Sequence, residues 1–182
     1  MRLDRLCLLS IDPARSSGWA IWNGRVLHDS GTALTAQDRA DAIERWLLLA
    51  ATRNLVRAVV AEGWSPGMLS HRTMFGCGAS WGRWCERLDD TGYREDHVLR
   101  YTPHQWRKLV GIRSRGRESC KAEAIRMVDR IYGVTAMDDQ AEAILIGRAA
   151  LTDTPSLCKV LPGRVRKLLL VDDEPTTQEG VR

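Results

Sequence analysis

The sequence predicts a mixed β-sheet covered by helices, in the α/β or α+β class. Short apolar runs of strand length occur at five places, and the first three follow one another directly. Helical segments separate the later strands and follow the last one. The 182 residues suffice for one domain with a sizeable core.

The first third of the chain is expected to supply most of the sheet. Its predicted strands are Leu6–Asp12, Gly18–Trp22 and Arg25–Ser30. The nearly continuous apolar run before Asp12 is typical of a strand buried on both faces. Asn23-Gly24 indicates a type I′ turn, so the second and third strands should be antiparallel. An amphipathic helix, Ala36–Arg53, should follow with Thr35 as its N-cap.

Further along, short strands alternate with helices. The expected strands are Val56–Ala61, which leads into Glu62, and Val98–Tyr101. Helices are expected from Met74 onward, from Pro103 to Gly111, over Glu118–Ile131 and over Met137–Leu151. A C-terminal extension, residues 152–182, is basic and then acidic, and we expect its last ten or so residues to be poorly ordered.

Composition narrows the function classes. The net charge of +4 weakly favours a polyanionic partner. No apolar run approaches the length of a membrane span, and the N-terminal residues lack a signal-peptide pattern. The five cysteines show neither CxxC pairs nor Cys/His spacing, which disfavours zinc and indicates reduced thiols in the cytoplasm.

Acidic residues stand at three suggestive places. Asp12 and Glu62 each end an apolar strand, and parallel neighbouring strands would bring both to the ligand-binding edge of the sheet. Each could equally be an ordinary turn acid. Asp138, Asp139 and Glu142 begin an apolar helix, and either aspartate shares a face with Glu142. The helix macrodipole alone would also favour acids there.

Carboxylates gathered in this way would need a counter-charge. They would repel one another and raise each other's pKa. Bound Mg²⁺ would relieve that repulsion because it prefers hard oxygen ligands. Two such ions, roughly 4 Å apart, clamp the attacking and leaving oxygens of a phosphodiester. The pattern therefore suits metal-assisted hydrolysis of a phosphate ester.

Four motifs in order resemble those of the RuvC-type Holliday junction resolvases of the RNase H-like superfamily. They are IDPARSSGWAIW, VVAEGW, YTPHQWRKLVG with the following SCKAEAIRMV, and MDDQAEAILIG, and their order and spacing match from about residue 6 to 150. The resemblance implies an α/β, RNase H-like fold over residues 1–151, with a mixed five-stranded sheet flanked by helices. It also implies a homodimer that cuts four-way DNA junctions by paired nicks with Mg²⁺, or Mn²⁺ in its place.

The same resemblance implies that the catalytic metal ligands are Asp12, Glu62, Asp139 and Glu142, with Asp138 as an alternative to Asp139. Departures from the family pattern, among them the extra Asp138 and the tail past Thr152, indicate a divergent member from a phage or mobile element. Ala14 replaces a glycine, Glu142 stands where aspartate is usual, and the segment after Glu62 has Trp64, His71 and Arg72 in place of the usual Phe and Asn.

Basic residues are densest around the third motif. Phosphate contacts are expected from Arg107, Lys108, Arg115 and Lys121, although any one of them could simply be solvated. Aromatic residues near the second motif could stack on unpaired bases or belong to the core; these are Trp64, Phe75, Trp81 and Trp84. Small residues there also suit a close helix pair across a dimer axis; these are Cys77, Gly78, Ala79 and Gly82.

Two other functions remain open. One is a less selective nuclease of branched DNA, and the other is a junction-binding protein without catalytic activity. The sugar-kinase/actin architecture also begins with an aspartate followed by glycine-containing turns, but it needs two such domains and this chain is too short for them.

Overall fold

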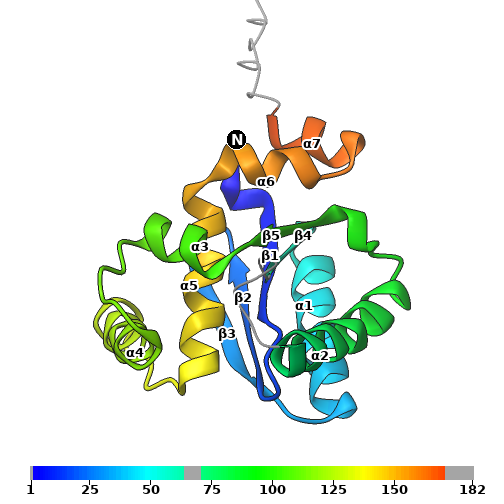
Figure 1. Ribbon diagram of the computed structural model, residues 1–182. Coiled ribbons are helices and arrows are strands. Elements are labelled where there is room, and N and C mark those ends of the chain that lie inside the picture. Colours follow the sequence, from blue (N-terminus) through cyan, green and yellow to red (C-terminus); the bar gives the residue numbers. More distant parts are fainter. Residues whose placement is uncertain (1, 64–70, 171–182) are drawn as a thin grey trace, which may run out of the picture.

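A five-stranded mixed sheet lies at the centre of the molecule (Figure 1). The structure is a computed structural model that describes residues 2–63 and 71–170. The strands, in the order β3-β2-β1-β4-β5, are β3 (Val26–Ala33), β2 (Ser17–Asn23), β1 (Leu6–Asp12), β4 (Val56–Glu62) and β5 (Val98–Tyr101). The pairs β1–β2 and β2–β3 are antiparallel, whereas β1–β4 and β4–β5 are parallel.

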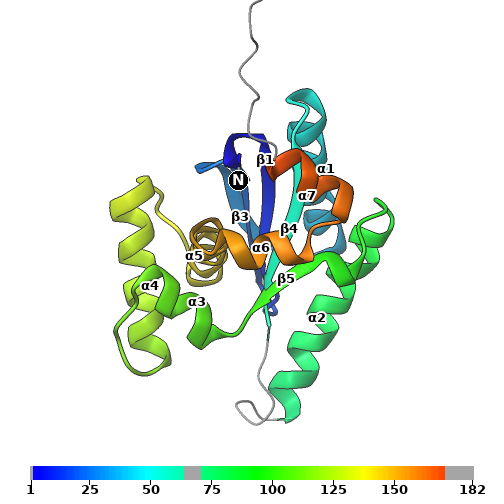
Figure 2. The same ribbon diagram turned by 90° about the horizontal axis from the view of Figure 1, so that it is seen from above.

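Helices cover both faces of this sheet (Figures 1 and 2). On one face lie α1 (Ala36–Thr52) and α2 (His71–Asp89), and on the other lie α3 (Pro103–Val110), α4 (Arg117–Tyr132) and α5 (Asp138–Thr152). Short 3-10 turns, Leu3–Arg5 and Glu95–His97, precede β1 and β5. The three layers confirm the predicted α/β class.

The central strand β1 is buried along its whole length, as the apolar run predicted. Leu6 and Leu8 belong to the core beneath α5, whereas Cys7 and Leu9 belong to the core beneath α1 and α2. Each face of the sheet therefore has its own apolar core, and the alternation along β1 joins the two.

The hairpin between β2 and β3 forms as expected, but its turn lies one residue later than predicted. Asn23 is still part of β2 and pairs with Val26, so the two turn residues are Gly24 and Arg25. Gly24 carries the positive φ, at 59°, which is the pattern of a type II′ turn and not of type I′. A register shift at Ile21/Trp22 accompanies this change.

Two glycines let α5 approach the sheet closely. A Cβ on Gly18 would lie 1.8 Å from the backbone oxygen of Asp139, and one on Gly147 would lie 2.1 Å from Nε1 of Trp22. The backbone of α5 at Asp139 and the side chains of Trp22 and Ser10 in the sheet thus occupy the space that larger residues would fill. This contact fixes the first turn of α5 beside the end of β1.

The C-terminal extension begins with two helices that the sequence did not predict, α6 (Thr154–Val160) and α7 (Gly163–Leu170). Leu157, Leu161 and Leu169 are buried in the core beneath α5, and the Arg2 amide donates to the Leu169 carbonyl at 2.8 Å. The two helices cover the end of the sheet where β1 begins (Figure 1). The residues for which disorder was expected, and Trp64, lie outside the described residues. No helix in the described part of the chain could cross a membrane.

Candidate metal centre

Two parallel strands bring acids to the same edge of the sheet. Ile11 of β1 pairs with Ala61 of β4, so Asp12 and Glu62 come next on adjacent strands. The side chain of Asp12 lies on the α5 face, and the residue is only 5% exposed. No donor among residues 2–63 and 71–170 forms a hydrogen bond with its carboxylate. An ionised carboxylate so placed is costly unless a cation compensates it.

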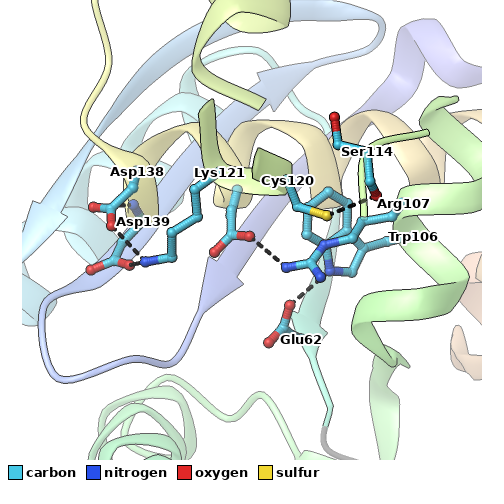
Figure 3. Close-up of polar contacts among 9 residues, drawn as sticks. Glu62, Trp106, Arg107, Ser114, Cys120, Lys121, Asp138 and Asp139 are labelled. Atoms are coloured by element: carbon cyan, nitrogen blue, oxygen red, sulfur yellow. Dashed lines mark hydrogen bonds and ion pairs between the residues drawn. The ribbon is translucent and has the colours of Figure 1, made fainter. Parts of the chain in front are cut away.

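Helix α5 contributes the other two acids. One carboxylate oxygen from each of Asp12, Asp139 and Glu142 lies within 4.8 Å of the others. Asp139 and Glu142 are three residues apart and therefore share a face of α5. Of the two neighbouring aspartates it is Asp139 that joins Asp12, whereas Asp138 is directed to Lys121 (Figure 3).

Each acid except Asp12 has a partner from α3 or α4 (Figure 3). Arg107 donates to Glu142 at 2.8 Å, and Glu142 is 6% exposed. Lys121 contacts Asp138 at 2.5 Å and Asp139 at 3.5 Å. With Asp12 and Glu62, five carboxylates face these two cations, so three negative charges would be uncompensated if all five were ionised.

Trp106 holds Glu62 and is a site residue that sequence reasoning missed. Its indole Nε1 donates to Oε2 of Glu62 at 2.7 Å, and the tryptophan is fully buried. Arg107 packs its guanidinium over the same ring, 5.1 Å from the centroid. A signal was present, since Thr102 and Pro103 begin a helix that places Trp106 inward, and a buried indole N–H needs an acceptor.

The pKa shifts report the uncompensated charge. Burial, with the charges of Glu62, Glu142 and Asp139, raises the pKa of Asp12 well above its usual range. Burial also raises the pKa of Glu62 to about 7, although the hydrogen bond from Trp106 opposes that rise. Groups that are this difficult to ionise without a cation are typical of functional sites.

The pKa values of the neighbouring Asp138 and Asp139 shift in opposite directions. Burial and the charge of Asp138 raise the pKa of Asp139. The hydrogen bond from Lys121 lowers the pKa of Asp138. Burial lowers the pKa of Lys121, but the hydrogen bond to Asp138 and the surrounding acids outweigh it and raise the pKa overall. Asp138 is thus a salt-bridged acid, while Asp139 belongs to the crowded set.

The residues present fit a divalent cation. Three carboxylates from two different elements converge on one point, all offering hard oxygen ligands of the kind that Mg²⁺ and Mn²⁺ accept. Neither sulfur nor imidazole belongs to this group. Glu62 adds a fourth carboxylate whose second oxygen is not used by Trp106.

The other residues singled out in the sequence divide into two groups. Arg107 and Lys121 are largely buried against the acids, whereas Lys108 and Arg115 are exposed on α3 and on the link to α4. Among the aromatics, Trp81 and Trp84 are core residues of α2, while Phe75 is 81% exposed. The side chains of His71 and Arg72 are outside the described residues.

Comparison with solved structures finds proteins of similar fold. The structure of Thermus thermophilus RuvC in complex with a Holliday junction substrate has a TM-score of 0.56 to this chain at 18% identity, covering 81% of this chain and 94% of RuvC. A second T. thermophilus RuvC structure has a TM-score of 0.55 at 19% identity, with 82% and 95% covered. The chain has the RuvC fold.

This RuvC fold, which is RNase H-like, agrees with the architecture that the four motifs implied. The yeast mitochondrial Holliday junction resolvase Ydc2 is also found, with a TM-score of 0.43 at 14% identity, covering 92% of this chain and 85% of Ydc2. Neither a scan against protein-family models nor a search of curated proteins finds a match to the sequence.

Proposed function

We propose that this chain is a divalent-metal-dependent endonuclease that resolves four-way (Holliday) DNA junctions by paired nicks. The observation that carries the proposal is the convergence of Asp12, Asp139 and Glu142 within 4.8 Å, beside Glu62, at the edge of a RuvC fold. Mg²⁺, for which Mn²⁺ substitutes, would be held by these four carboxylates in a two-metal site and would supply Lewis-acid activation of the phosphodiester.

The residues around the acids have distinct roles in this proposal. Trp106 fixes one oxygen of Glu62 and leaves the other free. Arg107 donates to Glu142 and holds its carboxylate in the cluster. Lys121 orients the first turn of α5 through Asp138 and Asp139, and together with Arg107, Lys108 and Arg115 it would attract the DNA backbone.

The test uses purified protein, a mobile four-way junction and a linear duplex of matched sequence, with Mg²⁺ or Mn²⁺. The expected result is paired cuts in the junction alone. Asp12→Asn should abolish cutting and leave junction affinity unchanged, because it removes a ligand charge without removing a basic residue. Cutting that persists in Asp12→Asn would refute the assignment of the site.

Two outcomes would favour the alternatives. Comparable cutting of flaps, forks and duplex would indicate a less selective nuclease of branched DNA. Tight junction binding with no cutting by either metal would indicate an inactive binding protein. The retained acidic cluster favours a nuclease over a binding protein.

A homodimer is part of the proposal, because paired nicks on two strands require two centres. Helix α2 supports it: Phe75 is exposed, and a Cβ added at Gly78 or Gly82 would meet nothing within 4 Å. A helix from a second copy could approach this face closely. Analytical ultracentrifugation should show a dimer, and Gly82→Trp should weaken it. We assign the cytoplasm as the compartment, since none of the five cysteines is in a disulfide within the described chain.

A further inference from the structure

Helix α2 contacts the turn that follows Asp12, on the side of the sheet opposite α5. The hydroxyl of Ser80 donates to the Ala14 carbonyl at 2.8 Å and lies 3.0 Å from the hydroxyl of Ser17. Arg83 is one helical turn further along α2 and is exposed. Arg83 therefore lies on the α1–α2 side of the sheet, separate from the basic residues of α3 and α4.

Arg39, in the first turn of α1, is buried, and its guanidinium has fewer hydrogen-bond acceptors than donors. The residue is 1% exposed, and its Nη1 donates to the Thr35 carbonyl at 2.8 Å. Its Nε and Nη2 atoms are buried and form no hydrogen bond within the described part of the chain. Two of the donors that make up one edge of the guanidinium are thus available for an acceptor.

Neighbouring acids do not compensate the charge of Arg39. The adjacent Asp38 uses its carboxylate on the amides of Leu34 and Thr35, both at 2.8 Å. Burial lowers the pKa of Arg39 and the nearby Arg83 lowers it further, while the charge of Asp38 opposes this only in part. Neither arginine forms an ion pair with a carboxylate of residues 2–63 or 71–170. Two like charges, one of them buried, are expected to attract an anion.

We propose that Arg39 and Arg83 form a phosphate-binding subsite that holds the DNA backbone on the α1–α2 side of the metal centre. The identity of this anion as a DNA phosphate rests on the proposed function. The free Nε and Nη2 edge of a guanidinium matches two oxygens of a phosphate. A phosphodiester at Asp12 is followed by further phosphates along its strand, and Ser80, one helical turn before Arg83, contacts the turn that follows Asp12.

Arg83 is the exposed member and Arg39 the buried one. A phosphate would therefore contact Arg83 first, and no ion pair in the described chain holds the Arg83 side chain in place. The subsite would thus contact the backbone opposite Arg107 and Lys121, so that the duplex is held from both sides of the acids.

The first experiment tests the anion site without DNA. Melting temperatures are measured in EDTA with millimolar inorganic phosphate against chloride at equal ionic strength, for the full chain and for Arg39→Met, Arg83→Ala and Arg87→Ala. Arg87 is the matched control, one turn further along α2 and paired with Asp90 at 3.5 Å. Phosphate should raise the melting temperature of the wild type and Arg87→Ala in a saturable way, and of Arg39→Met not at all.

The melting temperature in chloride shows whether Arg39→Met is folded. Removing an unpaired buried charge should leave the protein folded and at least as stable in chloride as the wild type. An equal phosphate response in Arg39→Met and the wild type would overturn the subsite. The absence of a phosphate response in the wild type would also overturn the subsite. In that case, a melting temperature that rises with protein concentration would indicate that a carboxylate from a second copy pairs with Arg39.

The second experiment measures junction and duplex binding by fluorescence anisotropy over a salt series in EDTA, where no cutting occurs. Arg83→Ala should reduce the slope of log K against log salt concentration by about one on both DNAs, and Arg87→Ala should not. An unchanged slope in Arg83→Ala would refute the DNA contact. Loss of nuclease activity alone leaves both readouts intact, so failure of the proposed function is distinguishable from failure of the subsite.

Discussion

Replacing Glu62 with glutamine should stabilise the metal-free protein at pH 8. Burial raises the folded-state pKa of Glu62 to about 7, from an ordinary value of 4.5. Between these pH values the folded protein binds more protons than the unfolded chain, so its stability falls as pH rises through that window and stays low above it. Glutamine has no charge to lose, and its side-chain oxygen still accepts the hydrogen bond from Trp106.

The size of the effect follows from the shift. A rise from 4.5 to about 7 corresponds to about 3 kcal/mol, at about 1.4 kcal/mol for each pH unit. Solvent reduces this because Glu62 is only half-buried, and about 1–2 kcal/mol is a reasonable expectation. For a protein of this size that gain should raise the melting temperature by roughly 3–6 °C.

The assay is thermal unfolding in EDTA at pH 5, 6, 7 and 8, with Glu123→Gln as a control of opposite sign. Hydrogen bonds from Ser114 and Arg113 lower the pKa of Glu123, so its charge stabilises the fold at neutral pH and its replacement should destabilise it. Mg²⁺ should reverse the order for Glu62, stabilising the wild type at pH 8 far more than Glu62→Gln. If wild type and Glu62→Gln differ equally at pH 5 and pH 8 in EDTA, the reasoning is wrong.

Three further predictions concern the same centre. Asp139→Asn should reduce Mg²⁺-dependent cutting at least about 100-fold and Asp138→Asn about tenfold or less, because only Asp139 lies beside Asp12; equal losses would contradict this. Gly18→Ala should cost about 1–3 kcal/mol in urea unfolding, since its Cβ would lie 1.8 Å from the Asp139 carbonyl oxygen; an unchanged midpoint would argue against the packing. Trp106→Phe should weaken Mn²⁺ binding, measured by calorimetry, about tenfold with DNA affinity preserved; unchanged Mn²⁺ affinity would exclude a positioning role.

The sheet was predictable from the sequence because its signals are local. The uninterrupted apolar run of β1 requires burial on both faces, and period-2 alternation then determines which residues reach each core. Two of the four acids were predictable for the same reason, since a residue that ends a parallel strand lies at a known edge. The turn at Gly24 was misplaced because Asn23-Gly24 and Gly24-Arg25 both provide a glycine, and only strand pairing decides between them.

The choice between Asp138 and Asp139 could not be made from spacing. Both aspartates share a face of α5 with Glu142, and the difference arises from rotation of the helix against β2. That rotation depends on the contact at Gly18 and on Lys121, which are distant in sequence. Helices α6 and α7 were missed for a related reason. They contain few apolar residues, and the burial of Leu157 and Leu169 depends on core residues that are distant in sequence.

Ala14, which stands where the resemblance led us to expect glycine, needs no special backbone conformation. Asn54 is the residue other than glycine with a positive φ in the described chain, so Ala14 adopts an ordinary one. Its carbonyl accepts hydrogen bonds from Ser17 at 2.9 Å and from Ser80 at 2.8 Å, and its amide donates to the Asp12 carbonyl. The backbone of this turn therefore connects α2 to the strand that carries Asp12, and the methyl group can be tolerated because the turn uses the peptide groups and not the side chain.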